Sequence, residues 1–222
     1  MQTGVEALGR AVSFAREHPE ATLSVLLVVA VLVLGVYAFR RLRRPAGPRF
    51  LSLLADRDEA AVLMHPNPDP DAMAAAMGVG TLARQAGTEP TLYYSGAVRH
   101  QENRAFRTVL DLDMERVEHV SDLDTETVVL VDHNRPRGFD GAEAVMPTAV
   151  VDHHPGDGTG EVFTDVRTEY GATSSILSEY FEEIGASPVA PDQHASEVRS
   201  EFTLPSDVAS GLLYGILTDT ND

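Results

Sequence analysis

Two apolar segments of the chain each end in an aspartate followed by a histidine. Val150-Val151 leads into Asp152-His153-His154, and the segment 128–131 leads into Asp132-His133-Asn134. Short uncharged runs rich in Val are typical of buried strands. In an open α/β sheet, ligands gather just beyond the carboxyl ends of the strands. Either triplet alone could be a loop with hydrogen-bonded histidines, but two strands that deliver Asp-His to the same edge indicate a metal site.

A third group of candidate ligands lies in the loop His65-Pro66-Asn67-Pro68-Asp69-Pro70-Asp71. The loop follows a predicted strand over 60–64. Its three prolines exclude a helix before Asp71, which we expect to cap the next helix. A turn role could explain Asp69 or Asp71 alone, but it leaves His65 at the end of a strand unexplained.

These segments and the aspartate near the end of the chain supply more ligands than one tetrahedral zinc needs. The candidate metal ligands are His65, Asp69, Asp71, Asp132, His153 and Asp219. The chain has no Cys, so no thiolate can take part. Mixed imidazole and carboxylate ligands suit Mn²⁺ or Mg²⁺. Two such ions about 3.5–4 Å apart, bridged by a carboxylate and a hydroxide, form a site for phosphoryl transfer.

The charge balance narrows the class of partner. The chain has 34 acidic residues, 17 Arg and no Lys, and residues 50–222 alone carry 31 acidic residues against ten Arg, a net charge of −21. Such a surface argues against binding of duplex nucleic acid through a basic patch. It also suits a cytosol of very high salt, where charge repulsion is screened. We therefore expect a halophilic protein, with general acidic solubility as the alternative.

The N-terminal part predicts a membrane anchor. Ala21–Phe39 contains no charged residue and consists mainly of Val and Leu. At 1.5 Å per residue it spans roughly 28 Å, close to a hydrocarbon core of about 30 Å. The cluster Arg40-Arg41-Leu42-Arg43-Arg44 follows, and by the positive-inside rule it places the rest of the chain in the cytoplasm. We expect a single-pass cell-membrane protein with an N-terminal segment 1–20, a transmembrane helix 21–39, a basic linker 40–49 and a cytoplasmic domain 50–222.

The pattern of the remaining residues predicts an α/β domain with a mostly parallel sheet flanked by helices. We expect strands over 60–64, 91–94, 116–120, 128–131 and 147–151. We expect helices over 50–54, 72–86, 102–110, 171–184 and 205–217, and an exposed loop over 188–203.

Four motifs together resemble those of the DHH superfamily of phosphoesterases. They are His65-Pro-Asn-Pro-Asp69-Pro-Asp71, Val131-Asp132-His133-Asn134, Val151-Asp152-His153-His154 and Gly215-Ile-Leu-Thr-Asp219-Thr220. They occur in the family's order within residues 60–222. The resemblance implies a DHH-type catalytic domain and a centre of two Mn²⁺ ions, for which Mg²⁺ or Co²⁺ could substitute.

The resemblance also implies a role for each residue. His65 and Asp69 would bind the first ion, Asp71, His153 and Asp219 the second, and Asp132 would bridge the two. His154 would contact the phosphate, and Asp152 would support the histidines without binding a metal. A bridging hydroxide would attack phosphorus in line. Arg135, Arg137 and His133 could contact the substrate, although surface ion pairs explain the two arginines at least as well.

Within the superfamily, the chain looks most like oligoribonuclease/phosphoadenosine-phosphate phosphatases and membrane-bound cyclic-dinucleotide phosphodiesterases. This implies a manganese-dependent hydrolase of phosphodiester or phosphomonoester bonds in small nucleotides: short oligoribonucleotides, linear or cyclic dinucleotides, and phosphoadenosine phosphate. The Asp132-His133-Asn134 motif looks more like manganese-dependent inorganic pyrophosphatases, so hydrolysis of pyrophosphate or polyphosphate is the alternative function.

A third hypothesis is a membrane-tethered nucleotide-binding module without turnover. Family members continue into a second, smaller domain that closes over the site, whereas this chain ends three residues after Asp219. We therefore expect either a fragment or a truncated protein with little activity. A homodimer is compatible with all three hypotheses.

Overall fold

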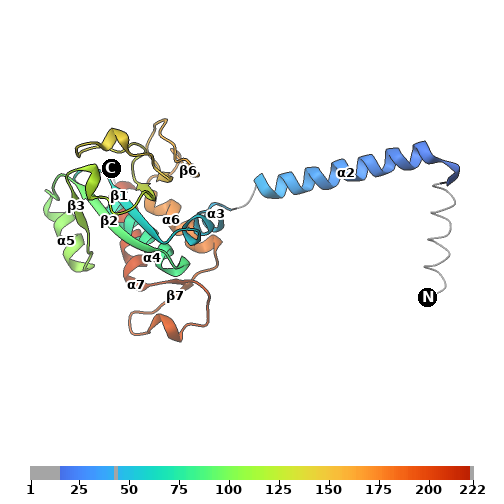
Figure 1. Cartoon of the computed structure of the whole chain (residues 1–222). Helices are drawn as coiled ribbons and strands as arrows, with labels where there is room; N and C mark the ends of the chain where they lie inside the picture. The colour runs from blue at the N-terminus through green and yellow to red at the C-terminus, as the bar shows by residue number, and fades with distance from the viewer. Residues whose placement is uncertain (1–15, 43–44, 221–222) are drawn as a thin grey trace. The chain divides into compact units, whose positions relative to one another are not determined.

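The computed structural model describes residues 16–42 and 45–220, and it describes their side chains except for residues 36–42 and Ala195. The predicted segment 1–20 and the arginine cluster 40–44 thus lie wholly or partly outside the described residues. The chain forms two compact units, Met1–Arg44 and Pro45–Asp222 (Figure 1). Each unit is described by itself.

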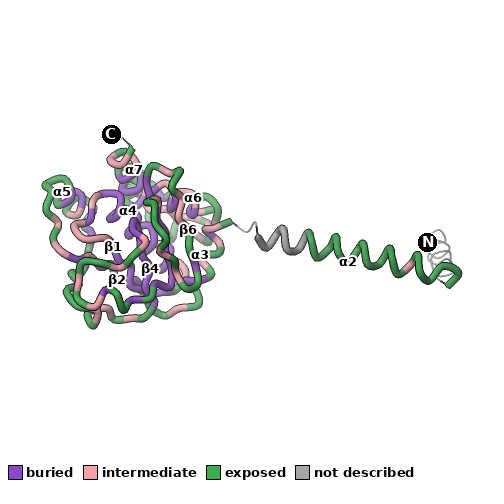
Figure 2. The backbone as a smooth tube through the Cα atoms, turned by 90° about the horizontal axis from the view of Figure 1, so that it is seen from above, coloured by how far each residue is buried: buried purple, intermediate pink, exposed green. Residues whose placement is uncertain are grey.

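The described part of the first unit is dominated by the helix α2, Pro19–Leu42. Proline suits the first helical position and Glu20 the first turn, where a carboxylate interacts favourably with the helix dipole. The Leu and Val side chains described on α2 are exposed, with Leu26 59% and Leu34 65% accessible (Figure 2). The sequence predicts a transmembrane helix over 21–39. Among the described residues, no helix combines the length and the apolar character needed to cross a membrane.

The second unit is built on a six-stranded sheet with the strand order β3-β2-β1-β4-β5-β6. The strands are β1 Glu59–Met64, β2 Glu89–Ser95, β3 Glu115–Val117, β4 Val128–Val131, β5 Ala149–Asp152 and β6 Phe163–Val166. All neighbouring strands pair in parallel, so their carboxyl ends lie at one edge. The order of the strands reverses between β1 and β4, which is the switch point where ligands bind in open α/β sheets.

Helices and short 3₁₀ turns connect these strands (Figure 1). The helices are α3 Ala46–Ala55, α4 Pro70–Ala86, α5 Gln101–Val109, α6 Thr173–Glu183 and α7 Ser206–Thr220. The 3₁₀ turns are η1 Val120–Asp122, η2 Ala142–Ala144 and η3 Ala195–Glu197. The prediction of an α/β fold with a mostly parallel sheet and flanking helices is confirmed.

Three local predictions were wrong. The predicted strand 116–120 ends at Val117, because η1 begins at Val120. The strand β6 was missed, since its four residues include two polar ones and carry no clear alternation. The predicted loop 188–203 begins and ends in a small parallel pair, β7 Ser187–Pro188 with β8 Thr203–Leu204, and it contains η3.

The strands bury both of their faces, and alternate residues enter different clusters. Ala60, Val62 and Met64 of β1 join the larger cluster with α3, α4, α6 and α7, whereas Ala61 and Leu63 join a smaller cluster on the other face. The helix α4 is buried along most of its length (Figure 2), and its alanines let it pack closely against both the sheet and α7. The first turn of α4 and the last turn of α7 are therefore held rigidly beside the carboxyl ends of the strands.

Candidate metal centre

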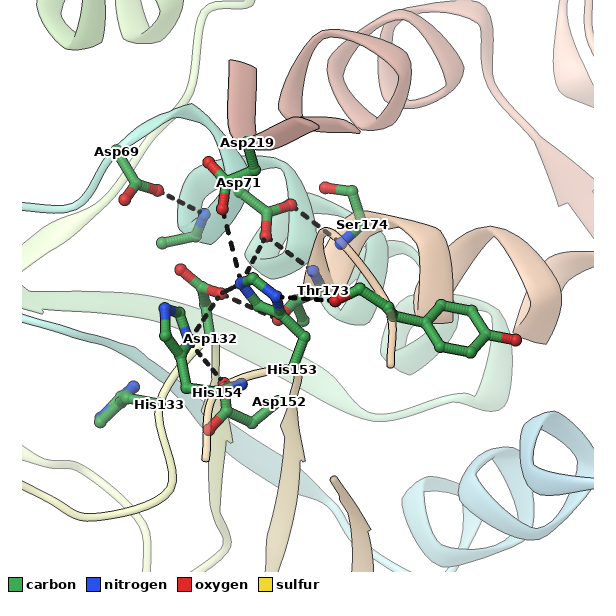
Figure 3. Close-up of polar contacts among 12 residues, drawn as sticks. Asp69, Asp71, Asp132, His133, Asp152, His153, His154, Thr173, Ser174 and Asp219 are labelled. Atoms are coloured by element: carbon green, nitrogen blue, oxygen red, sulfur yellow. Dashed lines mark hydrogen bonds and ion pairs between the residues drawn. The ribbon is translucent and has the colours of Figure 1, made fainter. Parts of the chain in front are cut away.

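The structure brings all six predicted ligands to the carboxyl edge of the sheet. They come from the ends of β1, β4 and β5, the start of α4 and the last turn of α7. They form three overlapping groups in which the potential ligand atoms lie within 4.8 Å of one another: His65–Asp69–Asp132, Asp71–His153–Asp219 and Asp132–His153–His154. Figure 3 shows the imidazole of His153 facing three carboxylates from different segments.

The two aspartates at the start of α4 have different partners. Asp69 caps the helix, since its Oδ1 accepts a hydrogen bond of 3.0 Å from the Ala72 amide and Pro70 occupies the first turn. The prediction that Asp71 caps α4 was therefore wrong. Asp71 lies inside the first turn and accepts hydrogen bonds of 2.7 and 2.9 Å from the backbone amides of Thr173 and Ser174 (Figure 3).

The environment of Asp71 combines burial with a helix N-terminus. The side chain is fully buried, and burial together with the nearby Asp132 carboxylate raises its pKa to about 7, although the amides at the start of α6 oppose this rise. The amides and the dipole of α6 favour the charged form. A cation beside Asp71 would tip this balance fully toward the carboxylate.

Asp132 stands at the centre of the groups. Its backbone has a φ of 62°, the left-handed region that non-glycine residues rarely adopt and that often marks functional sites. Its side chain is 1% exposed; Oδ1 accepts a hydrogen bond of 2.8 Å from the Thr173 hydroxyl, and Oδ2 lies 3.4 Å from His65 Nε2 without a hydrogen bond. The two oxygens therefore face different halves of the centre, as a bridging carboxylate requires.

Backbone carbonyls fix the orientation of two of the histidines. His65 Nδ1 lies 3.0 Å from the Pro66 carbonyl, and His153 Nδ1 lies 3.2 Å from the Tyr170 carbonyl. A carbonyl only accepts, so each Nδ1 carries the proton and each Nε2 turns toward the carboxylates. Metal-binding histidines are commonly oriented in this way.

Each of these Nε2 atoms faces carboxylate oxygens from more than one residue. His65 Nε2 is 3.3 Å from Asp69 Oδ2, and His153 Nε2 is 3.4 Å from Asp219 Oδ2 and 3.5 Å from Asp132 Oδ1. Among the described residues, His153 Nε2 and Asp132 Oδ2 are buried without a hydrogen-bond partner. Nitrogen and oxygen lone pairs that point at one another need a positive charge between them. The donor set, imidazole and carboxylate without thiolate, fits divalent ions such as Mn²⁺.

In the metal-free protein, protons on the histidines supply this positive charge. Burial disfavours protonation of His65, but the Asp132 and Asp69 carboxylates outweigh it and raise the pKa of His65 to about 10. The Asp219 carboxylate, assisted by Asp132, raises the pKa of His153 to about 9 against the effect of burial. A metal ion must displace these protons in order to bind.

His154 differs from its neighbour His153. Its side chain is 50% exposed, and its Nδ1 lies 2.9 Å from Asp152 Oδ1 and 3.6 Å from Asp132 Oδ1. The buried Asp152 also accepts hydrogen bonds from the His154 amide (3.0 Å) and from Asn134 Nδ2 (2.7 Å), as Figure 3 shows in part. The carboxylates of Asp152 and Asp132 raise the pKa of His154, chiefly through its hydrogen bond with Asp152. Asp152 thus orients the His154 ring through Nδ1, so Nε2 is the ring nitrogen that could contact a substrate.

This geometry can be compared with known families. The model of the DHH family, N-terminal domain, matches residues 59–216, a span that contains five of the six predicted ligands. The chain belongs to the DHH family.

Two relatives and one solved structure are similar to this chain. The DHH chain is 32% identical over 160 residues to an uncharacterized protein of Methanocaldococcus jannaschii, covering 72% of the chain and 30% of that protein. It is 26% identical over 162 residues to a probable manganese-dependent inorganic pyrophosphatase of Enterococcus faecalis, covering 72% of the chain and 47% of that protein. A crystal structure of an exopolyphosphatase-related protein from Bacteroides fragilis shares the fold, with a TM-score of 0.52 and 16% identity over 79% of this chain and 50% of that one. The chain spans about half the length of these proteins, or less.

Three predicted substrate-binding residues lie outside the ligand groups of this DHH domain. Arg135 is exposed and forms a surface ion pair with Asp157. Arg137 is also exposed, and its carbonyl accepts a hydrogen bond of 3.2 Å from Ser95. His133 is 2% exposed, and burial lowers its pKa to about 4, so the ring is neutral and packs behind the centre.

Sequence reasoning missed the residues that hold the ligands in place. The amides of Thr173 and Ser174, the Thr173 hydroxyl and the Tyr170 carbonyl all come from one segment that the motifs do not include. Two hydroxyl residues at the start of a predicted helix were the available signal, because such positions often bind anionic groups. Their target, a carboxylate about a hundred residues away in the sequence, could not be inferred without the fold.

Proposed function

We propose that this DHH domain hydrolyses phosphorus–oxygen bonds in small phosphate-containing substrates with the help of two divalent cations, most naturally Mn²⁺. The observation that carries the proposal is the sharing of ligands: Asp132 belongs to the groups on both sides of the centre, and one of its oxygens faces each side. The manganese-dependent relative from Enterococcus faecalis supports the choice of metal.

The protein's own residues would hold the cations and the substrate. His65, Asp69 and Asp132 form one binding position, and Asp71, His153 and Asp219 form the other. When bound, the cations would neutralise charge on the phosphoryl group and acidify a water molecule. The phosphate would interact with the cations of the centre and with a hydrogen-bond donor on the solvent side.

His154 would supply that donor. Its Nδ1 lies 2.9 Å from Oδ1 of the buried Asp152, and this hydrogen bond raises the pKa of the ring and so favours its protonated form. An imidazolium in this position can donate to a phosphoryl oxygen and stabilise charge that develops in the transition state. Asn134 stabilises this arrangement through its own hydrogen bond to Asp152.

We propose small nucleotides, such as short oligoribonucleotides, linear or cyclic dinucleotides and phosphoadenosine phosphate, as the main substrate class. Pyrophosphate or polyphosphate is the second candidate. Two observations favour the second: the name of the Enterococcus faecalis relative and the Asp132-His133-Asn134 motif. Both classes present a phosphate to the same centre, so the choice between them depends on groups outside it.

The test is a panel of hydrolysis assays with the full chain in high KCl. Pyrophosphate, tripolyphosphate, pApA and cyclic di-AMP are incubated with Mn²⁺, Mg²⁺ or Co²⁺, and with EDTA as a metal-free reference. We expect turnover that depends on the metal and is lost in Asp132→Asn. Asp157→Asn is the matched control and should keep its activity, because this exposed aspartate pairs with Arg135 and, among the described residues, with no other cation. Metal-dependent nucleotide binding without turnover on any substrate would favour the binding-module hypothesis.

We also propose that the apolar helix attaches the domain to the cell membrane, with the domain on the cytoplasmic side. The exposed Leu and Val side chains of α2 and the arginine cluster after it support this proposal. Protease added to sealed right-side-out vesicles should spare residues 50–222. Recovery of the protein in the soluble fraction, or digestion of the domain in sealed vesicles, would contradict it.

A further inference from the structure

Near the carboxyl edge of the sheet lies a pocket lined by three arginines and two aspartates, in which one of the arginines, Arg116, pairs with Glu118. A cavity of about 820 Å³ opens between the end of β2, the helix α5 and the strand β3. We call it the arginine pocket; it is lined by Arg104, Arg107, Arg116, Tyr94, Asp111 and Asp113, among others. Its volume lies within the range of sites that bind small molecules of nucleotide size.

Arg107 contacts both the backbone and an aromatic ring of the arginine pocket. Its Nε and Nη2 each lie 3.4 Å from a backbone carbonyl, those of Leu112 and Met114, and its guanidinium lies 5.9 Å from the centroid of the Tyr94 ring. These long contacts restrain the half-buried side chain weakly, and several of its N–H groups remain available. A planar guanidinium is well suited to binding a phosphate through two hydrogen bonds.

The charges of Arg104 and Arg107 are not neutralised. Within the described residues, neither guanidinium forms an ion pair with a carboxylate; Arg104 donates to the Arg99 carbonyl instead. Among the described residues, three of the ten arginines of this domain, Arg116, Arg135 and Arg167, pair with a carboxylate, so an unpaired guanidinium is common here. Arg104 and Arg107 differ from most of the others in that they line one cavity together. Two unpaired guanidiniums in the same cavity can bind an anion.

Several hydrogen bonds fix the arginine pocket relative to the metal-binding loop. The Asn67 side chain accepts a hydrogen bond of 2.7 Å from the Arg99 amide, and the Asn67 amide donates one of 3.2 Å to the Ser95 carbonyl. Asn103 at the start of α5 donates one of 2.8 Å to the Pro68 carbonyl. Asn67 and Pro68 lie between the ligands His65 and Asp69.

The arginine pocket and the candidate ligand loop lie at neighbouring strands. The strand β2 is the direct neighbour of β1, and neighbouring strands lie about 4.8 Å apart. Tyr94, near the end of β2, lines the pocket, and His65 follows the end of β1. A substrate that occupies both sites would have to extend along this edge of the sheet.

We propose that the arginine pocket binds a second, non-reacting phosphate of the substrate and so selects substrates with at least two phosphate groups. This inference rests on the proposed hydrolase function and deepens it. The second phosphate can come from a polyphosphate chain or from a nucleotide, and both sources share the chemistry that Arg107 and Arg104 recognise.

The test compares substrates of different length in Arg107→Gln, Arg104→Gln and the double variant. The substrates are p-nitrophenyl phosphate, which has one phosphate, tripolyphosphate and pApA. We expect KM to rise about 10-fold or more for tripolyphosphate, pApA or both, the loss expected when a charged hydrogen bond is removed. The kcat values, and all constants for p-nitrophenyl phosphate, should stay within about twofold. The substrate whose KM rises identifies the source of the second phosphate.

Arg199→Gln is the matched control, because this exposed arginine also lacks an ion pair among the described residues and precedes α7, whose opposite end carries Asp219. Unchanged KM for both long substrates, or an equal loss on p-nitrophenyl phosphate, would overturn the proposal. Circular dichroism melting must show that the variants fold. If Arg107→Gln does not fold, Arg104→Gln, which alters an exposed residue, is the variant to compare with the wild type.

A second measurement separates this inference from the hydrolase proposal. Calorimetry with metal-free protein measures binding of tripolyphosphate and of ADP in the absence of the cations that would hold a reacting phosphate. Binding that weakens about 10-fold in Arg107→Gln supports the pocket even if no substrate is hydrolysed. No binding by the wild type, or equal binding by Arg107→Gln, would refute the pocket even if the protein is an active hydrolase.

Discussion

The two ligand groups of the metal centre are assembled in different ways. The first, His65–Asp69–Asp132, takes two of its members from one loop of five residues, and Asp69 is 41% exposed. The second, Asp71–His153–Asp219, draws one member each from α4, the end of β5 and α7, and Asp71 is fully buried. The first group is therefore defined by local sequence and the second by the packing of the fold. We expect substitutions elsewhere in the domain to disturb the second group more than the first.

The largest effect is expected from Asp132, which belongs to the first group and whose Oδ1 lies 3.5 Å from His153 Nε2 of the second. Asp132→Asn replaces a carboxylate with an amide that cannot bridge two cations as strongly. We expect Mn²⁺ content to fall from near two per chain to below one and turnover to be lost, as measured by metal analysis after dialysis and by hydrolysis assays. Two retained ions would show that Asp132 does not connect the groups.

The adjacent histidines should separate metal binding from substrate binding. His153→Ala should lower Mn²⁺ affinity and turnover together, because His153 faces three carboxylates of the centre. His154→Ala should leave the metal content unchanged and lower turnover by about 10²–10³-fold, the loss expected when one transition-state donor is removed. The opposite pattern would reverse the two roles.

The two aspartates of α4 test the contrast between local and packed ligands. Asp71→Asn should destabilise the metal-free domain by about 1–3 kcal/mol, because an amide cannot accept hydrogen bonds from both the Thr173 and Ser174 amides. Asp69→Asn should change stability by less than about 0.5 kcal/mol, since Asn caps helices as well as Asp does. Both should weaken Mn²⁺ binding. Urea unfolding with EDTA measures the difference, and equal destabilisation by the two variants would refute the contrast.

The pH dependence of stability follows from the histidines that face the carboxylates. The pKa values of His65 and His153 are raised to about 10 and about 9, so above pH 7 the folded state holds protons that the unfolded state has released. Stability from these protons is present below pH 6.5 and is lost as the pH rises through 9–10, at about 1.4 kcal/mol per pH unit for each proton. The melting temperature of the metal-free domain should thus fall between pH 7 and pH 10, and Mn²⁺ should abolish this fall. A melting temperature that rises with pH in EDTA would contradict the assignment.

The smallest effect is expected at Arg135. Its surface ion pair with Asp157 contributes little, so Arg135→Gln should change kcat/KM by less than about twofold. A loss of 10-fold or more in kcat/KM would indicate that Arg135 contacts the substrate. KM for each substrate of the panel is the decisive measurement.

The parallel sheet and the clustering of the candidate ligands could be predicted from the sequence for one reason. Val128–Val131 and the strand before Asp152 are short and apolar, so the polar residues that follow them mark the carboxyl edge. The strand β6 lacked such a contrast and was missed. The contact of Asp71 with α6 and the left-handed backbone of Asp132 depend on packing between distant segments, and no local pattern encodes them. Asp219 was expected beyond the last helix, but α7 continues through Thr220 and carries it on its final turn.

The position of Asp219 on α7 has a consequence for the order of assembly. The candidate ligands extend from His65 to Asp219, so the second ligand group cannot form before α7 has been synthesised. Until α7 docks on α4, the group lacks one of its three members. Uptake of a second ion, if the proposed centre binds two, would therefore depend on the docking of α7 and would stabilise that contact.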